Sequence, residues 1–199
     1  MAVAHGAAAL GLVAKMPSGP GPIGDELIQA ITKTVPPPIA TFLLTSETTV
    51  DAIVAHHHRT NTNTIQLVDA LEDEQYHELK TQLPAISIVQ VIHVVNEASV
   101  EEALRISEKA DALLLDSGNP QLAVKELGGT GRVHNWQLSR RIVAQSKAPV
   151  FLAGGLNSNN VKRALEEVQP YGLDLCSSVR TNGRLDPQKL EQFFTAVYG

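Results

Sequence analysis

The chain has 199 residues, 43% of them hydrophobic, and a formal net charge of -5, so it can bury one sizeable core and we expect a single domain over residues 1–199. Lys and Arg are scattered rather than clustered, which argues against a nucleic-acid partner, and no apolar run approaches the ~20 residues of a membrane-spanning helix. The one cysteine, Cys176, excludes an intramolecular disulfide and a multi-thiolate metal site, and it fits the cytoplasmic location that we expect.

Short apolar stretches alternate with amphipathic stretches along the chain. The apolar stretches predict buried strands over residues 9–14, 39–44, 64–68, 87–94, 112–117, 150–155 and 173–177. Apolar residues at helical spacing predict helices over residues 25–34, 48–58, 73–82, 99–110, 137–146, 160–168 and 186–197. This order favours an α/β fold in which helices cover a parallel sheet.

Seven strand–helix units can be counted, whereas eight would close a TIM (β/α)8 barrel. A polar residue or glycine ends nearly every predicted strand, and barrel enzymes keep their chemistry at that end of the strands. We therefore expect a TIM-type barrel that is incomplete. An open doubly wound sheet is the alternative, but the G-x-G-x-x-G turn that would favour it does not follow the first predicted strand.

One stretch, residues 112–131, combines a buried strand, a carboxylate and a glycine-rich loop. The strand ends near Asp116, and the loop closes on GGTG at 128–131. A strand of this kind delivers a polar group to a site, and glycines leave room for a ligand. The alternative is that Asp116 only caps a loop.

From residue 113 to residue 190 the sequence resembles the phosphoribosylanthranilate isomerase family. The resemblance is carried by LLLDS (113–117), GGTG with a Trp five residues later (128–136), PVFLAGGLNSNNV (149–161) and YGLDLCSSVRTNGRLD (171–186). Upstream, GAAALGLV (6–13) and IQLVD (65–69) resemble the second and fourth strands of the family more thinly.

The resemblance implies an eight-stranded barrel and an Amadori rearrangement in tryptophan biosynthesis, with no metal and no cofactor. In the family an acid protonates the ribose ring oxygen, the ring opens to an imine, and a base takes the C2 proton to give an enolamine. Asp116 lies at the position of the acid. A carboxyl group at a strand end in a partly buried cavity suits proton donation.

The same resemblance predicts where the substrate binds. Barrels often bind phosphate on the loops after their last two strands, and the glycines and serines found there are Gly154, Gly155, Ser177 and Ser178. Glycines in the GGTG loop, Gly129 and Gly131, are expected to flank the substrate. The plainer interpretation is that these glycines only permit tight turns or positive backbone dihedrals.

Two features of the family have no counterpart in this sequence. The family's base is a cysteine in a Lys-Ile-Cys-Gly segment of the first strand, which we expect this chain to lack, and its loss would also explain the count of seven units. Cys176 is interpreted as a small buried hydrophobe within the last strand. Ser18-Gly19-Pro20 stands where the family has an arginine that contacts the anthranilate carboxylate, so Arg180 or Arg132 would have to supply a cation.

Two functions therefore stay open. One is an isomerase that acts on a small phosphorylated sugar-amine, and the other is a non-catalytic relative that binds a phosphosugar or phosphate and has lost the base. The missing strand would expose unpaired strand edges, which makes a homo-oligomer one expected outcome.

The remaining polar residues of interest are histidines, one carboxylate and one tryptophan. His56, His57 and His58 point about 100° apart on a helix and cannot converge on one metal ion, so we expect a solvated helix end. His93 and Asp69 end predicted strands and either is a possible substitute base, although a lone histidine in an apolar strand is more often a satisfied core residue. Trp136 is expected to pack under the glycine loop.

Overall fold

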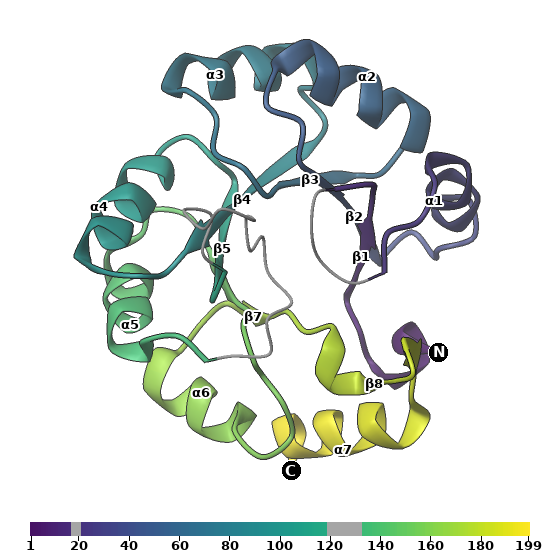
Figure 1. Ribbon diagram of the computed structural model, residues 1–199, viewed down its shortest axis with the longest axis vertical. Helices are drawn as coiled ribbons and strands as arrows, with labels where there is room; N and C mark the ends of the chain where they lie inside the picture. Colours follow the sequence, from purple (N-terminus) through teal and green to yellow (C-terminus); the bar gives the residue numbers. More distant parts are fainter. Residues whose placement is uncertain (17–20, 119–132) are drawn as a thin grey trace.

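Seven parallel strands, each followed by a helix, form most of a barrel wall in the computed structural model (Figure 1). The structure describes residues 1–16, 21–118 and 133–199. The strands are β1 (Ala9–Val13), β2 (Ala40–Thr45), β3 (Thr64–Leu67), β4 (Ser87–His93), β5 (Ala112–Asp116), β6 (Val150–Leu152) and β7 (Gly172–Leu173). Each strand pairs in parallel with the next one along the chain, in the order β1 to β7. The predicted α/β fold with about seven strand–helix units is confirmed.

Seven α-helices cover the outside of this sheet within the described part of the chain (Figure 1). They are α1 (Asp25–Thr32), α2 (Val50–Thr60), α3 (Asp73–Gln82), α4 (Glu97–Ile106), α5 (Trp136–Gln145), α6 (Val161–Val168) and α7 (Pro187–Tyr198). None of them is long and apolar enough to cross a membrane. The sequence did not predict two short 3₁₀ helices, η1 (Ala2–His5) and η2 (Ser177–Val179), or the antiparallel hairpin of β8 (Arg180–Thr181) and β9 (Arg184–Leu185).

Side-chain caps set where several helices begin. Asn96 accepts a hydrogen bond from the Ala98 backbone N–H at 3.0 Å, so α4 begins at Glu97, two residues before the predicted start. Asp186 accepts from the backbone N–H groups of Gln188 and Lys189, and a proline follows it at the first position of α7, where the missing N–H costs nothing.

The strands alternate between two apolar layers. On β5, Leu113 and Leu115 join the cluster shared with the helices, whereas Ala112 and Leu114 join a smaller cluster of strand residues inside the barrel. Because side chains alternate across a strand, Asp116 continues the inner row. On β5 the apolar inner row ends at Leu114, and the polar Asp116 follows at the carboxyl end of the strand.

The last strand is shorter than the predicted 173–177. β7 ends at Leu173, and the backbone of Cys176 has left the extended region at φ -133 and ψ -70. Packing also limits this strand, because a Cβ atom on Gly172 would lie 2.7 Å from the Phe151 ring. Residues 174–178 therefore form a rim above the sheet rather than part of it.

His56 and His57 are buried, so the prediction of a solvated helix end is wrong for both. His56 bonds through Nδ1 to Thr45 Oγ1 at 2.9 Å and through Nε2 to Asp25 Oδ1 at 3.1 Å. His57 Nε2 bonds to the Thr62 carbonyl at 2.7 Å. Within residues 1–16, 21–118 and 133–199, no group of three or more His, Cys, Asp or Glu side chains is placed to hold a metal ion.

Candidate active site

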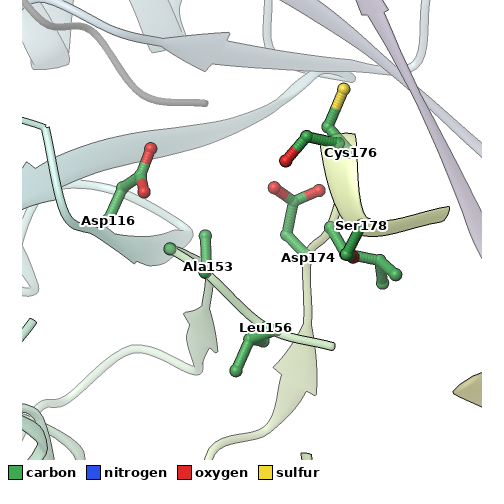
Figure 2. Close-up of a pocket in the computed structure, with 10 residues that line it drawn as sticks. Asp116, Ala153, Leu156, Asp174, Cys176 and Ser178 are labelled. Carbon is green, nitrogen blue, oxygen red and sulfur yellow. The ribbon is translucent and has the colours of Figure 1, made fainter. Parts of the chain in front are cut away.

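A pocket lies at the carboxyl ends of β5, β6 and β7 (Figure 2). It encloses about 350 Å³ of empty space, which includes the part open to solvent. Its lining consists of Asp116, Ala153, Gly154, Gly155, Leu156, Asp174, Leu175, Cys176, Ser177 and Ser178. Since parallel neighbouring strands end at the same edge of a sheet, three separate segments of sequence converge here.

Five of the seven site residues expected from the sequence line this one pocket. They are Asp116, Gly154, Gly155, Ser177 and Ser178. The other two, Gly129 and Gly131, lie outside the described residues, as do Arg132 and the Ser18-Gly19-Pro20 segment.

Asp116 is the last residue of β5 and is only 7% exposed. One of its carboxylate oxygens accepts a hydrogen bond from the Ser117 backbone N–H at 2.7 Å, and the Ser117 hydroxyl lies 3.4 Å from the same oxygen. The carboxylate thus fixes the start of the following loop and also faces the pocket. Capping a loop and serving a site are compatible roles for this residue.

Gly154 and Gly155 both have positive φ, at 80° and 66°. A Cβ atom on Gly154 would lie 3.0 Å from the backbone N, Cβ and Oγ of Ser117. The loop after β6 therefore needs glycine at 154 both for its backbone conformation and for its close approach to the loop after β5.

The loop after β6 presents backbone donors at the pocket. The side-chain amides of Asn157 and Asn160 donate to the Gly155 carbonyl at 3.1 and 3.0 Å. In a trans peptide the C=O and N–H point in opposite directions, so the Leu156 N–H points away from these two asparagines. The N–H groups of Gly155 and Leu156 donate to no acceptor among the described residues. Unpaired backbone donors beside paired glycines suit an anionic group.

Asp174 is a pocket residue that sequence reasoning missed. It directly follows β7, lines the pocket and is exposed to solvent. Burial raises the pKa of Asp174 to about 6, and the negative charge of Asp116 adds to the rise. Because the side chain is exposed, solvent screens both effects and makes the rise smaller. The alternation Leu173, Asp174, Leu175 was a usable signal, since it places a carboxylate on the inner row.

Cys176 differs from its interpretation as a buried residue within the last strand. It follows β7, is partly exposed and lines the pocket. Figure 2 shows its sulfur pointing away from the carboxylates of Asp116 and Asp174. It is neither a strand residue nor a core hydrophobe.

His93 is in register with Asp116 on the neighbouring strand, so it also belongs to the inner row. Both ring nitrogens are buried and make no hydrogen bond of good geometry to a described residue, although the Val68 backbone lies close by. The expectation of a satisfied core histidine is therefore wrong. Burial lowers the pKa of His93, and the nearby Asp116 opposes that effect.

The other two residues named from the sequence point elsewhere. Arg180 donates from Nη1 to the Gly183 carbonyl at 2.8 Å, within the β8–β9 hairpin, and does not line the pocket. Trp136 is buried as the first residue of α5, and the Arg163 guanidinium lies 4.8 Å from the centre of its ring.

Comparison with known proteins gives a consistent result. Residues 4–196 match the family model described as N-(5'phosphoribosyl)anthranilate (PRA) isomerase. The N-(5'-phosphoribosyl)anthranilate isomerase of Methanothrix thermoacetophila is 33% identical over 199 residues, which cover 98% of this chain and 90% of that protein. The enzyme of that name from Methanocella arvoryzae is 30% identical over 189 residues, or 95% of this chain and 86% of that protein.

Solved structures agree on the fold. Phosphoribosyl anthranilate isomerase from Thermotoga maritima superposes with a TM-score of 0.79 and 26% identity, covering 98% of this chain and 90% of that chain. The structure from Thermococcus kodakaraensis gives a TM-score of 0.80 at 22% identity and covers 100% of this chain and 92% of that chain. The expected TIM-type fold is confirmed.

Proposed function

Because the chain belongs to the N-(5'-phosphoribosyl)anthranilate isomerase family, we propose that it performs the family's reaction, the Amadori rearrangement of an aminoaldose phosphate to an aminoketose phosphate in tryptophan biosynthesis. The observation that carries this proposal is that a family match over residues 4–196 coincides with one pocket that holds Asp116, the glycine pair and the serine pair. The non-catalytic alternative is not favoured, because the relatives that match are named as isomerases.

The substrate phosphate is assigned to the loops after β6 and β7. Gly154 and Gly155 allow close approach of the ligand to the backbone, and the free N–H groups of Gly155 and Leu156 are suitable donors. The Ser178 hydroxyl is buried and has no hydrogen-bond partner among the described residues. A structurally similar isomerase, with a TM-score of 0.76 at 24% identity, was solved with reduced 1-(o-carboxyphenylamino)-1-deoxyribulose 5-phosphate, a ligand that carries such a phosphate.

Asp116 is assigned as the general acid. Its carboxyl group is held at the end of β5 by the Ser117 backbone and faces the pocket, where a sugar ring next to the bound phosphate would come within reach. Proton transfer to the ring oxygen makes it a better leaving group, and the ring then opens.

Substitution of the proposed acid tests this function. We expect the chain to consume phosphoribosylanthranilate, measured by the loss of substrate fluorescence, and Asp116→Asn to lower kcat by about 10²–10⁴-fold, because the amide cannot donate the proton. Asp51→Asn, on an exposed carboxylate at the start of α2, is the matched control and should leave turnover unchanged. Full activity of Asp116→Asn would contradict the role of this residue, and a chain that neither turns over the substrate nor binds the reduced product analogue in calorimetry would contradict the function.

Self-association is a further part of the proposal. One Thermotoga maritima structure is described as monomers generated from a dimeric phosphoribosylanthranilate isomerase. In this chain β1 and β7 end the sheet and pair on one side only within the described residues. A homo-oligomer, the single domain and the cytoplasmic location all stay predictions.

A further inference from the structure

We propose that Asn157 and Asn160 are positioning residues of the phosphate site, because their side-chain amides hold one peptide bond with its N–H directed at the pocket. That peptide bond joins Gly155 to Leu156. The inference rests on the proposed function, which assigns the substrate phosphate to the loop after β6, and it names the residues that set how strongly this loop binds. Three features support it: the pattern of hydrogen bonds, the conformational freedom of the glycines and the way in which α6 begins.

Both asparagine side chains converge on the Gly155 carbonyl. The amide nitrogens of Asn157 and Asn160 lie 3.1 and 3.0 Å from its oxygen, and both residues are partly buried. The peptide bond is trans, so the Leu156 N–H points away from the two asparagines. Leu156 lines the pocket, and its N–H donates to no acceptor among the described residues. The asparagines thus occupy the carbonyl end of a peptide unit whose donor end is left for a ligand.

The two glycines give a ligand close access to the loop but leave its backbone poorly restrained. Gly154 and Gly155 have φ of 80° and 66°, and a glycine moves easily between such conformations and others. If the Gly155–Leu156 peptide rotated, its carbonyl oxygen would face the pocket and repel a phosphate. The asparagine amides oppose this rotation, because it would break both of their hydrogen bonds. They also polarise the peptide, which makes the Leu156 N–H a stronger donor.

Leu156 fixes the same peptide from the side of the core. Its side chain is 2% exposed and belongs to the apolar cluster shared with the helices. Figure 2 shows this side chain pointing away from the carboxylates of Asp116 and Asp174. The peptide is therefore restrained by apolar packing at one end and by two hydrogen bonds at the other. The buried Ser178 hydroxyl, which lines the same pocket and has no partner among the described residues, can contact the same anionic group.

Asn160 is the N-cap residue of α6, yet its side chain does not cap the helix. An asparagine at this position ordinarily accepts a hydrogen bond from a backbone N–H of the first turn, and Asn160 makes no such bond. Its Oδ1 atom instead accepts from the Asn157 backbone N–H at 2.8 Å, while its amide reaches back to Gly155. The side chain of Asn160 therefore serves the loop rather than the helix.

Asn160→Ser is the direct test, because serine caps helices as well as asparagine does, but its hydroxyl ends one bond short of the amide nitrogen. We expect KM for phosphoribosylanthranilate and the inhibition constant of inorganic phosphate both to rise by about 5–20-fold, as for the loss of one hydrogen bond, with kcat changed by less than about twofold. Asn157→Ala should act in the same direction. Asn159→Ala is the matched control, since Asn159 lies in the same turn, is exposed and makes no side-chain hydrogen bond within the described residues. It should leave all three constants unchanged.

The outcomes separate this inference from the proposed function. If Asn160→Ser and Asn157→Ala keep both KM and the inhibition constant of phosphate within about twofold of Asn159→Ala, the two asparagines do not position the peptide. A rise in KM without a matching rise in the inhibition constant of phosphate also overturns the inference, because the effect would then lie on another part of the substrate. A fall in kcat at unchanged KM overturns it as well, since it assigns the asparagines to the chemical step.

Turnover is not required for the comparison. If the wild type binds the reduced product analogue without turning over substrate, calorimetry with the analogue and with inorganic phosphate compares the same four proteins, and equal affinities overturn the inference. A chain that neither reacts nor binds the analogue rejects the proposed function and the inference with it.

Discussion

Two clusters of Asp and His side chains differ in whether their polar atoms are paired. In the first, His56 on α2 uses both ring nitrogens, and Asp25 accepts from His56 and from Arg59, whose Nε lies 2.6 Å from Asp25 Oδ2. In the second, at the strand ends, Asp174 has no polar partner and His93 no hydrogen bond of good geometry among the described residues. The same residue types thus hold two helices together through hydrogen bonds in the first cluster, whereas in the second cluster their polar atoms are free to contact a ligand.

The pKa values follow the same division. Burial acts to raise the pKa of Asp25, but the hydrogen bond from Arg59 and the neighbouring His56 outweigh it, and the net pKa is lowered. At the rim the pKa of Asp174 is raised, by desolvation and by the negative charge of Asp116, and no cation among the described residues opposes the rise. Pairing in the first cluster therefore supports the fold, whereas the ionised carboxylate of Asp174 lowers stability only slightly, because solvent reaches it.

Loss of the paired histidine should have the largest effect on stability. His56→Ala leaves Thr45 and Asp25 without a bond and opens space beneath α2, so we expect the free energy of unfolding to fall by about 2–4 kcal/mol. His58→Ala removes the same ring from an exposed position of the same helix and should change stability by less than about 0.5 kcal/mol. Urea titration measures both. Equal losses in the two variants would show that the bonds of His56 contribute nothing specific.

Gly154 connects the rim to the fold, and its substitution should have the next largest effect. Gly154→Ala forces an alanine to φ 80 and brings its Cβ to 3.0 Å from Ser117, so we expect a cost of about 1–3 kcal/mol and weaker binding of the reduced product analogue. Gly183→Ala is the matched control, because its φ is 76 but no atom lies within 4 Å, and it should cost about 1 kcal/mol with binding unchanged. If calorimetry shows equal binding of the analogue by both variants, Gly154 is not part of the ligand site.

The sequence was sufficient for what depends on local periodicity. All seven strands of the parallel sheet and the seven α-helices were predicted within a few residues, because each segment carries its own apolar alternation or helical spacing. Asp116 could be placed by the motif around it. What could not be predicted depends on contacts between distant segments. His56 was expected in solvent because its partner Asp25 lies 31 residues away on another helix. Asp174 was overlooked although its alternation with Leu173 and Leu175 was a usable signal, because only the fold shows that this side of the chain faces the pocket.

The smallest expected effect is on how stability depends on pH, which should differ in sign between substitutions of Asp174 and of Asp25. An acidic group whose pKa is raised on folding destabilises the protein above the folded pKa and has no such effect below the unfolded value, which is 3.8 for Asp174. Asp174→Asn removes that charge, so we expect its Tm to exceed that of the wild type slightly at about pH 8, because solvent screens the exposed carboxylate, and the gain to vanish by about pH 4. Asp25→Asn should behave in the opposite way, because the pKa of Asp25 is lowered: its loss should be greatest at neutral pH and should shrink as acid protonates the wild-type group. Melting curves of the three proteins across this range measure both effects. If Asp174→Asn proved less stable than the wild type at about pH 8, its carboxylate would have to be paired in solution, and the contrast between the two clusters would be lost.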